Sequence, residues 1–180
     1  MKVSLQVVGI FYSQTDIEVT AANPTVQDLM DAAEDPANYP ANVSSFKYTP
    51  HSVGRDEHGN MNPATMFSLS ATYKTGFTSR VEENHYPAGT YEMSESFALP
   101  NTKNPYTVWQ YYLLDKDHKR IPTAAVSEPF STQPLDQGEV QVAKVVWRLV
   151  SILSQPSIPA EQAGADLVLT RQHPKMSGRS

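Results

Sequence analysis

The sequence of 180 residues contains no cysteine, which excludes disulfides, iron–sulfur clusters, thiolate zinc sites and cysteine nucleophiles. Its eight glycines are scattered singly, so the chain carries neither a Walker phosphate loop nor a dinucleotide-binding fingerprint. No serine lies in a Gly-x-Ser-x-Gly elbow. The chain therefore offers no readable catalytic machinery, and we expect neither a metal nor a cofactor.

Long apolar runs and basic blocks are also lacking. Nothing approaches the roughly 20 apolar residues that a membrane-spanning helix needs. The net charge is -5, with no basic block before the C-terminal tail. Nucleic acid and membrane are therefore not expected partners, and a cytoplasmic protein is the default expectation. Fourteen prolines, abundant Ser, Thr, Asn and Tyr, and only six Phe and six Met are typical of a β-rich, loop-rich protein of one domain.

The longest apolar run is VQVAKVVWRLVSIL at residues 140–153, and we expect the fold to be organised around it. Its apolar positions fit one face of a helix and also fit one side of an extended strand. The β-branched content favours a strand, because Val and Ile lose rotamer freedom in a helix and pack well on a pleated surface. A strand that is apolar on both faces belongs in the middle of a covered sheet. We therefore predict a central strand that contains Trp147.

The first residues have the pattern of a β-hairpin. Val3, Leu5, Val7 and Phe11 alternate with Ser4 and Gln6, Val8 and Ile10 extend the apolar character to the other face, and the alternation resumes at positions 17–21. The segment 13–16 between them consists of turn-forming residues, so we expect the chain to reverse there. Gly9 fits a β-bulge in the first strand.

A short amphipathic helix is predicted next. Thr25 or Asn23 is the candidate N-cap, and Asp28 stands at the third position after Thr25, as in a capping box. Asp35-Pro36 ends the helix, because the residue before a proline disfavours helical geometry. The apolar residues that would face a sheet are Val26, Leu29, Met30 and Ala33.

Further strand patterns occur around Phe46 and Tyr48 and at residues 66–73, 91–99 and 108–114. Glu95 falls on the same side of its strand as the apolar residues, so it either lies at a rim or needs a partner. The last segment, 155–180, has scattered prolines and no stable period, and we expect a partly ordered tail.

The segment that follows Tyr48 holds the densest set of groups capable of metal binding or acid-base work: His51, Arg55, Asp56, Glu57 and His58. Their spacing fits no known site, and acidic residues beside an arginine are typical of a solvated hairpin tip. We therefore predict a long exposed loop or a protruding hairpin tip at this place.

Aromatic side chains are the remaining signal. On sheet faces they usually build the core, whereas those whose polar tip reaches a cleft line a ligand pocket or an interface. The candidate ligand-binding residues are Tyr73, Tyr91, Trp109 and Tyr111.

A hairpin at residues 3–19, a helix at 24–33 that starts Pro-Thr-Val-x-Asp-Leu, further strands and a closing strand at 145–151 together resemble the β-grasp, or ubiquitin-like, arrangement. The segments Trp109-Gln110-Tyr111-Tyr112 and Val146-Trp147-Arg148 also resemble soluble ligand-binding β-grasp modules related to the C-terminal domain of cobalamin carriers. In those modules a Trp-x-Tyr-Tyr strand precedes a loop and a Gly-containing turn before the final Trp strand. The resemblance covers about half of the chain.

The resemblance implies an α+β fold with a mixed β-sheet of β-grasp type, one short helix packed on it and a β-rich insertion. It implies one domain at residues 1–154, with the insertion at about 36–105, followed by the Pro-containing tail at 155–180. An insertion of this size is larger than a β-grasp normally has at that place.

Three functions are compatible with these observations. The leading hypothesis is a non-enzymatic binding module that presents an aromatic-rich sheet face or a loop surface to a protein partner or a small molecule. The second is a small metal-assisted or acid-base enzyme in which His51, Asp56 and His58 converge on Glu95 or His85. The third is a structural or assembly protein whose edge strands and tail join the subunits of a homo-oligomer.

Overall fold

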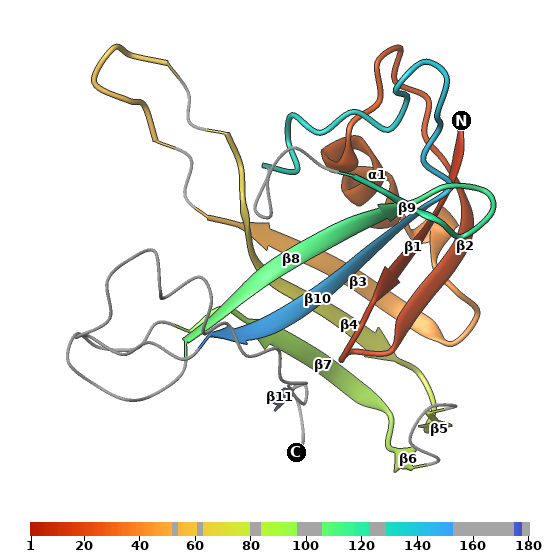
Figure 1. The fold of residues 1–180 in the computed structure, drawn as a ribbon. Coiled ribbons are helices and arrows are strands. Elements are labelled where there is room, and N and C mark those ends of the chain that lie inside the picture. Colours follow the sequence, from red (N-terminus) through yellow and green to blue (C-terminus); the bar gives the residue numbers. More distant parts are fainter. Residues whose placement is uncertain are drawn as a thin grey trace.

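The computed structural model describes residues 1–51, 54–60, 63–79, 84–96, 106–122, 129–152 and 175–177. Their strands form a five-stranded sheet, a four-stranded sheet and a two-stranded hairpin, and they include one α-helix, α1 (Val26–Ala33), and a short 3₁₀ helix, η1 (Pro36–Asn38) (Figure 1). The result is a mixed α and β structure with a mixed sheet, which agrees with the predicted α+β class. Within this described part, no helix has both the length and the apolar character needed to cross a membrane.

The five-stranded sheet is built around the valine-rich run. In spatial order its strands are β2 (Tyr12–Glu18), β1 (Lys2–Val7), β10 (Lys144–Ile152), β8 (Tyr106–Leu114) and β9 (Arg120–Ile121). The pairing of β1 with β10 is parallel, and the other pairs are antiparallel. The prediction of a central strand that contains Trp147 is confirmed, because β10 is the third strand of five. Trp147 on this strand is almost fully buried.

The four-stranded sheet comes mainly from the segment predicted as an insertion. Its strands in spatial order are β11 (Lys175–Ser177), β7 (Gly89–Ser94), β4 (Met66–Tyr73) and β3 (Val43–Pro50). The strands predicted around Phe46 and at residues 66–73 are confirmed. Residues 97–99 of the strand predicted at 91–99, and most of the predicted tail, lie outside the described residues. A separate short hairpin pairs β5 (Phe77–Thr78) with β6 (His85–Tyr86).

Helix α1 begins and ends where the sequence predicts. The Thr25 hydroxyl accepts a hydrogen bond from the Asp28 N–H at 3.3 Å, and the Asp28 carboxylate accepts one from the Thr25 N–H at 2.7 Å. These two bonds form the predicted capping box. The four predicted core residues, Val26, Leu29, Met30 and Ala33, are all fully buried, and the helix packs on β1 and β2.

Both α1 and the four-stranded sheet pack on one face of the five-stranded sheet (Figure 1). The ring of Tyr12 on β2 stacks on Phe46 of β3 at 4.2 Å between ring centres. The hydroxyl of Tyr73 on β4 donates to the carbonyl of Ile10 at 2.7 Å. Buried side chains of the helix and of both sheets therefore form one continuous hydrophobic core.

The position of the turn in the first hairpin was predicted wrongly. The chain reverses at residues 8–11, where Gly9 and Phe11 have φ angles of 103° and 64°. The segment 13–16 instead lies inside β2, where the pairing with β1 shifts register and Asp16 has a φ of 55°. Polar residues are tolerated there because β2 is an edge strand with one solvent face. Gly9 therefore serves the turn and not a bulge.

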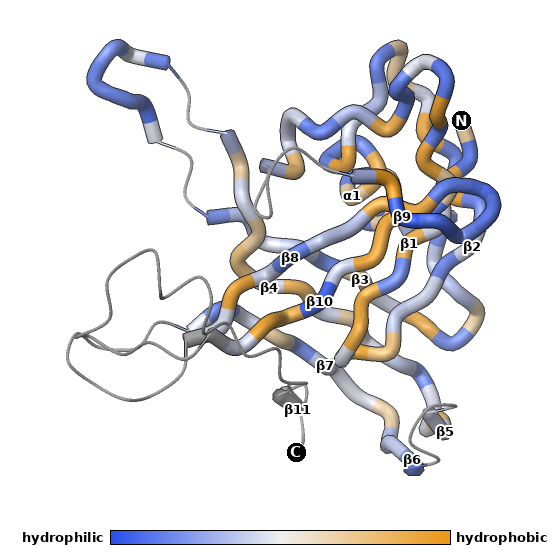
Figure 2. The backbone as a smooth tube through the Cα atoms, in the orientation of Figure 1, coloured by the Kyte–Doolittle hydropathy of each residue, from blue (hydrophilic) through white to orange (hydrophobic). Residues whose placement is uncertain are grey.

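The predicted exposed loop is confirmed for residues 54–60, which are all exposed. They project away from the two sheets between β3 and β4 (Figure 1) and are hydrophilic throughout (Figure 2). The carboxylate of Asp56 accepts hydrogen bonds from the backbone N–H groups of His58 and Asn60, at 2.9 and 2.8 Å. These bonds hold the tip in a turn.

Candidate functional site

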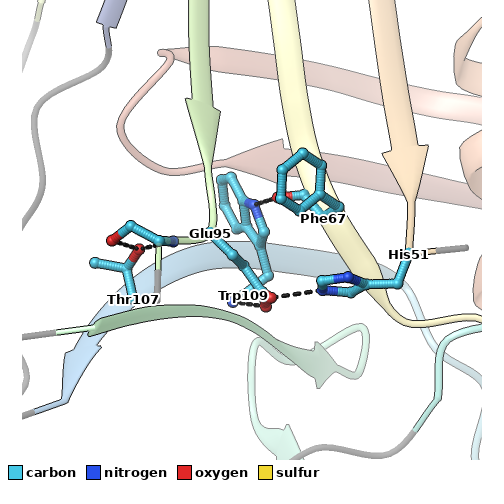
Figure 3. Close-up of polar contacts among 6 residues, drawn as sticks. His51, Phe67, Glu95, Thr107 and Trp109 are labelled. Atoms are coloured by element: carbon cyan, nitrogen blue, oxygen red, sulfur yellow. Dashed lines mark hydrogen bonds and ion pairs between the residues drawn. The ribbon is translucent and has the colours of Figure 1, made fainter. Parts of the chain in front are cut away.

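His51 and Glu95 meet where β3 and β7 end, although 44 positions separate them in the sequence. The Nε2 atom of His51 lies 2.6 Å from Oε2 of Glu95, and Figure 3 shows the two side chains pointing towards each other. The Glu95 side chain is only 9% exposed and that of His51 is 34% exposed. Of the groups proposed to converge in an acid-base enzyme, the structure brings these two together.

The second oxygen of Glu95 bonds to the backbone of β8. Oε1 accepts a hydrogen bond from the Trp109 N–H at 2.9 Å. Within the described residues, strand β9 pairs with Leu113 and Leu114 and does not extend to Trp109, so β9 offers this N–H no acceptor. The carboxylate therefore satisfies a backbone donor at a sheet edge, where an unpaired N–H would be costly. Glu95 lies on the apolar side of its strand, where the sequence indicates that it needs a partner. Its partners are the backbone N–H of Trp109 and the imidazole of His51.

Neighbouring bonds extend this junction between the two sheets. The indole N–H of Trp109 donates to the carbonyl of Phe67 on β4 at 3.1 Å. The Thr107 N–H donates to the Ser96 carbonyl at 2.8 Å, and the Ser96 N–H donates to the Thr107 hydroxyl at 2.8 Å (Figure 3). Both sheets are consequently joined by polar contacts beside the His51 pair.

A carboxylate that orients an imidazole is a recurrent part of general-base machinery. The other residues predicted for an acid-base site, Asp56, His58 and His85, do not join the His51–Glu95 pair. Asp56 and His58 make their contacts inside loop 54–60, and His85 pairs with Thr78 in the β5–β6 hairpin. Backbone hydrogen bonding from Asn60 holds the pKa of Asp56 below its ordinary value. Across the described ranges, no group of three or more His, Asp or Glu residues could hold a metal ion.

The first two predicted ligand-binding residues, Tyr73 and Tyr91, lie in one aromatic cluster. Their ring centres are 5.7 Å apart, and both rings also contact Phe77. Both side chains are buried, and the Tyr91 hydroxyl donates to the Pro87 carbonyl at 2.6 Å. Burial raises the pKa of Tyr73 above its ordinary value. These two tyrosines are therefore buried parts of the aromatic cluster around Phe77.

The other two predicted residues, Trp109 and Tyr111, belong to a second aromatic group. Their rings lie 6.4 and 4.8 Å from that of Trp147, on the face of β8 and β10 that is turned to the core. Phe130 completes this group, at 5.7 Å from Trp147. The four candidates are thus divided between two aromatic groups and do not form one site.

A cleft of about 520 Å³ opens between the β1–β2 turn and β5. Its apolar lining includes Val7, Val8, Phe11 and Phe77, and its polar lining includes Ser13 and Thr78. The Phe11 ring lies 5.5 Å from Phe77 and 4.3 Å from Tyr86, so the cleft borders the cluster that contains Tyr73 and Tyr91. Sequence reasoning missed the cleft because it placed the turn at 13–16. Gly9 and Phe11, which form the actual turn with positive φ angles, were the positions in the sequence that could have located the cleft.

Comparisons of the chain with models of protein families, with curated proteins and with solved structures gave no match.

Proposed function

We propose that this chain is a non-enzymatic binding module of β-grasp type that takes up a small, largely apolar ligand in the cleft beside the β1–β2 turn. The observation that carries the proposal is the cleft itself, with a volume of about 520 Å³ and aromatic rings in its wall. Ligand pockets in proteins are commonly about 300–1,000 Å³ and mostly apolar, with a few polar groups that orient the ligand.

The arrangement of the main sheet supports the β-grasp assignment. A hairpin leads into one capped helix, and the last long strand returns between β1 and β8, parallel to β1. The helix packs on the hairpin strands. On this assignment the strands β3, β4 and β7 are an inserted sheet that covers the part of the main sheet which the short helix leaves open.

The conformation of Phe11 supports a role for the cleft. A positive φ is rare for a bulky residue and costs free energy, so it persists where the surrounding structure requires it. Here it places the ring against Phe77 and Tyr86, at the mouth of the cleft. A planar apolar ligand would pack on these rings, and the Thr78 and Ser13 hydroxyls at the cleft would give it polar partners.

Thermal stability in the presence of small aromatic and apolar compounds tests this proposal. Burial of roughly 200 Å² of ligand surface gains about 5 kcal/mol before the cost of immobilisation, so the panel should be used at millimolar concentration. Thr78→Trp would fill the cleft from an exposed position, and Thr49→Trp is the matched control on an exposed strand position elsewhere. We expect a stabilising compound whose effect is lost in Thr78→Trp and kept in Thr49→Trp. A compound that stabilises both variants equally would place the binding site elsewhere.

Acid-base chemistry at His51 is a second candidate function, and the 2.6 Å contact with Glu95 is the observation that favours it. The carboxylate would hold the imidazole in one orientation. Hydrolysis of chromogenic ester substrates by His51→Ala and by a control, His118→Asn, would test it. His118 is exposed with a φ of 60°, a conformation that asparagine tolerates. Equal rates in the two variants would remove this candidate.

A further inference from the structure

The face of the five-stranded sheet that points away from the core carries a distinct set of residues. Strand pairing places Lys144, Leu114 and Arg120 in one row across β10, β8 and β9. The next row holds Val146 and Tyr112, and the third holds Arg148 and Gln110. Alternation along β10 puts all these residues opposite to Val145, Trp147 and Leu149, which belong to the core.

Tyr112 lies between two guanidinium groups on this face. The ring centre is 5.3 Å from the guanidinium carbon of Arg120 and 5.7 Å from that of Arg148. Such contacts are attractive because the ring face is electronegative, but they leave the N–H donors of the guanidinium unused. In the part of the chain that is described, neither arginine forms an ion pair with a carboxylate.

Arg148 also carries an unsatisfied donor. Its Nε atom is buried and has no hydrogen-bond partner. A buried donor without an acceptor is costly, and the cost is larger for a charged group. A partner molecule can therefore reach the half-buried Arg148 side chain only at its terminal N–H groups and not at Nε.

Within β8, β9 and β10 the three rows hold three cations, Lys144, Arg148 and Arg120, and no acidic residue, whereas at the other edge of the same face Glu18 of β2 lies opposite Lys2 of β1. The chain as a whole nevertheless carries a net charge of -5. A local positive surface on an acidic protein attracts a compact anionic group, whereas a long polyanion would also meet repulsion from the rest of the molecule. Half-buried Val108, Tyr112 and Leu114 on β8 add apolar surface beside the charges.

We propose that this surface, the outer basic face of Tyr112, Leu114, Arg120, Lys144 and Arg148, docks an acidic segment of a protein partner. A carboxylate of the segment bridges the terminal N–H groups of Arg120 and Arg148, since arginine binds carboxylates through paired N–H groups. An apolar side chain of the segment packs on the Tyr112 ring. This interaction is separate from ligand uptake in the cleft, whose lining contains none of these residues.

Fluorescence anisotropy with a labelled 12-residue peptide that alternates Glu with Leu and Phe tests the proposal. A peptide with Gln in place of Glu is the matched probe. We expect binding of the Glu peptide that weakens with added salt, and a loss of roughly 5-fold for Arg120→Gln or Arg148→Gln alone, as for a partly screened charge pair. Lys74→Gln removes an exposed cation from the turn after β4 and should leave the affinity unchanged.

Several results would overturn the proposal. These are no binding of the Glu peptide, equal binding of the Gln peptide, and full binding by the Arg120→Gln/Arg148→Gln double variant. Tighter binding of single-stranded DNA or of phosphatidylserine vesicles would assign the face to a polyanion. Self-association of the wild type that the double variant loses in light scattering would assign it to a second copy of the chain. If the variants do not fold, changes in the backbone amide NMR chemical shifts of the wild type on peptide addition provide the test. Changes confined to β8, β9 and β10 support the proposal, and changes elsewhere contradict it.

Discussion

Removal of the Glu95 carboxylate should destabilise the protein more than removal of any exposed acid. The carboxylate has two partners, the Trp109 N–H at 2.9 Å and His51 Nε2 at 2.6 Å, and its side chain is 9% exposed. Glu95→Ala deletes both acceptors and leaves the backbone donor of Trp109 at an open sheet edge. Glu95→Gln keeps one acceptor oxygen in nearly the same place but loses the charge.

The expected magnitude follows from these contacts. A hydrogen bond to a charged group contributes about 1.5–3 kcal/mol, and a buried donor left without a partner costs about 1–3 kcal/mol. Because these contributions overlap, we expect Glu95→Ala to lower the free energy of unfolding by about 3 kcal/mol. Glu95→Gln should cost about half as much. His51→Ala should cost about 1 kcal/mol, since that side chain is partly exposed and its contact with Glu95 is open to water.

Urea unfolding followed by tryptophan fluorescence is a suitable assay, because Trp109 and Trp147 are the only tryptophans and both are buried. For a chain of this length, a loss of 3 kcal/mol corresponds to a fall in melting temperature of roughly 6–12 °C. The double variant Glu95→Ala/His51→Ala completes a cycle, which gives the coupling energy between the two side chains. We expect a coupling of about 1 kcal/mol.

Glu57→Gln is the control, because Glu57 lies in the exposed loop and its side chain is 87% exposed. Its free energy of unfolding should stay within about 0.5 kcal/mol of the wild type. If Glu95→Ala were equally neutral, the carboxylate would not be holding the edge of β8. If Glu95→Gln cost as much as Glu95→Ala, the negative charge and not the acceptor position would be the source of the stability.

Two further predictions concern the helix and the buried tyrosines. Thr25→Ala removes the capping hydroxyl and should lower the free energy of unfolding by about 1 kcal/mol in urea titrations, whereas an unchanged value would refute a role for the cap. Burial raises the folded-state pKa of Tyr12 and Tyr73, so their contribution is complete below about pH 10 and is lost as the pH rises above it, by about 1.4 kcal/mol per pH unit for each. Urea titrations between pH 9 and 11 should show a shallower loss for Tyr73→Phe, and an identical slope would contradict this assignment.

Local sequence patterns predicted most of the elements because each pattern reports a local physical preference. The capping box at Thr25 and the spacing of Val26, Leu29, Met30 and Ala33 specify a helix without reference to the rest of the chain. The β-branched run predicted β10 for the same reason. The turn of the first hairpin was missed because polar residues favour both turns and the solvent side of an edge strand. Which of the two applies depends on strand pairing.

The candidate sites were harder to predict, because a site depends on residues that are far apart in the sequence. The sequence indicated that Glu95 needs a partner, and it named His51 among the groups that could reach it. It did not indicate the backbone N–H of Trp109, since which N–H groups lie at an open edge depends on how far β9 extends. The four predicted ligand-binding aromatics lie in two different groups for a similar reason. The face of the sheet on which a residue lies is known only once the strand register is known.

The amino-acid sequence by itself determined the helix with its cap, the central position of the valine-rich strand and the exposure of loop 54–60. These features follow from capping, side-chain shape and hydropathy, which act over a few residues. The tertiary structure alone decided the cleft beside Phe11, the contacts of Glu95 and the clustering of Arg120 and Arg148 around Tyr112. Each of these arises from strand register and from the packing of two sheets, and both are properties of contacts between distant segments of the chain.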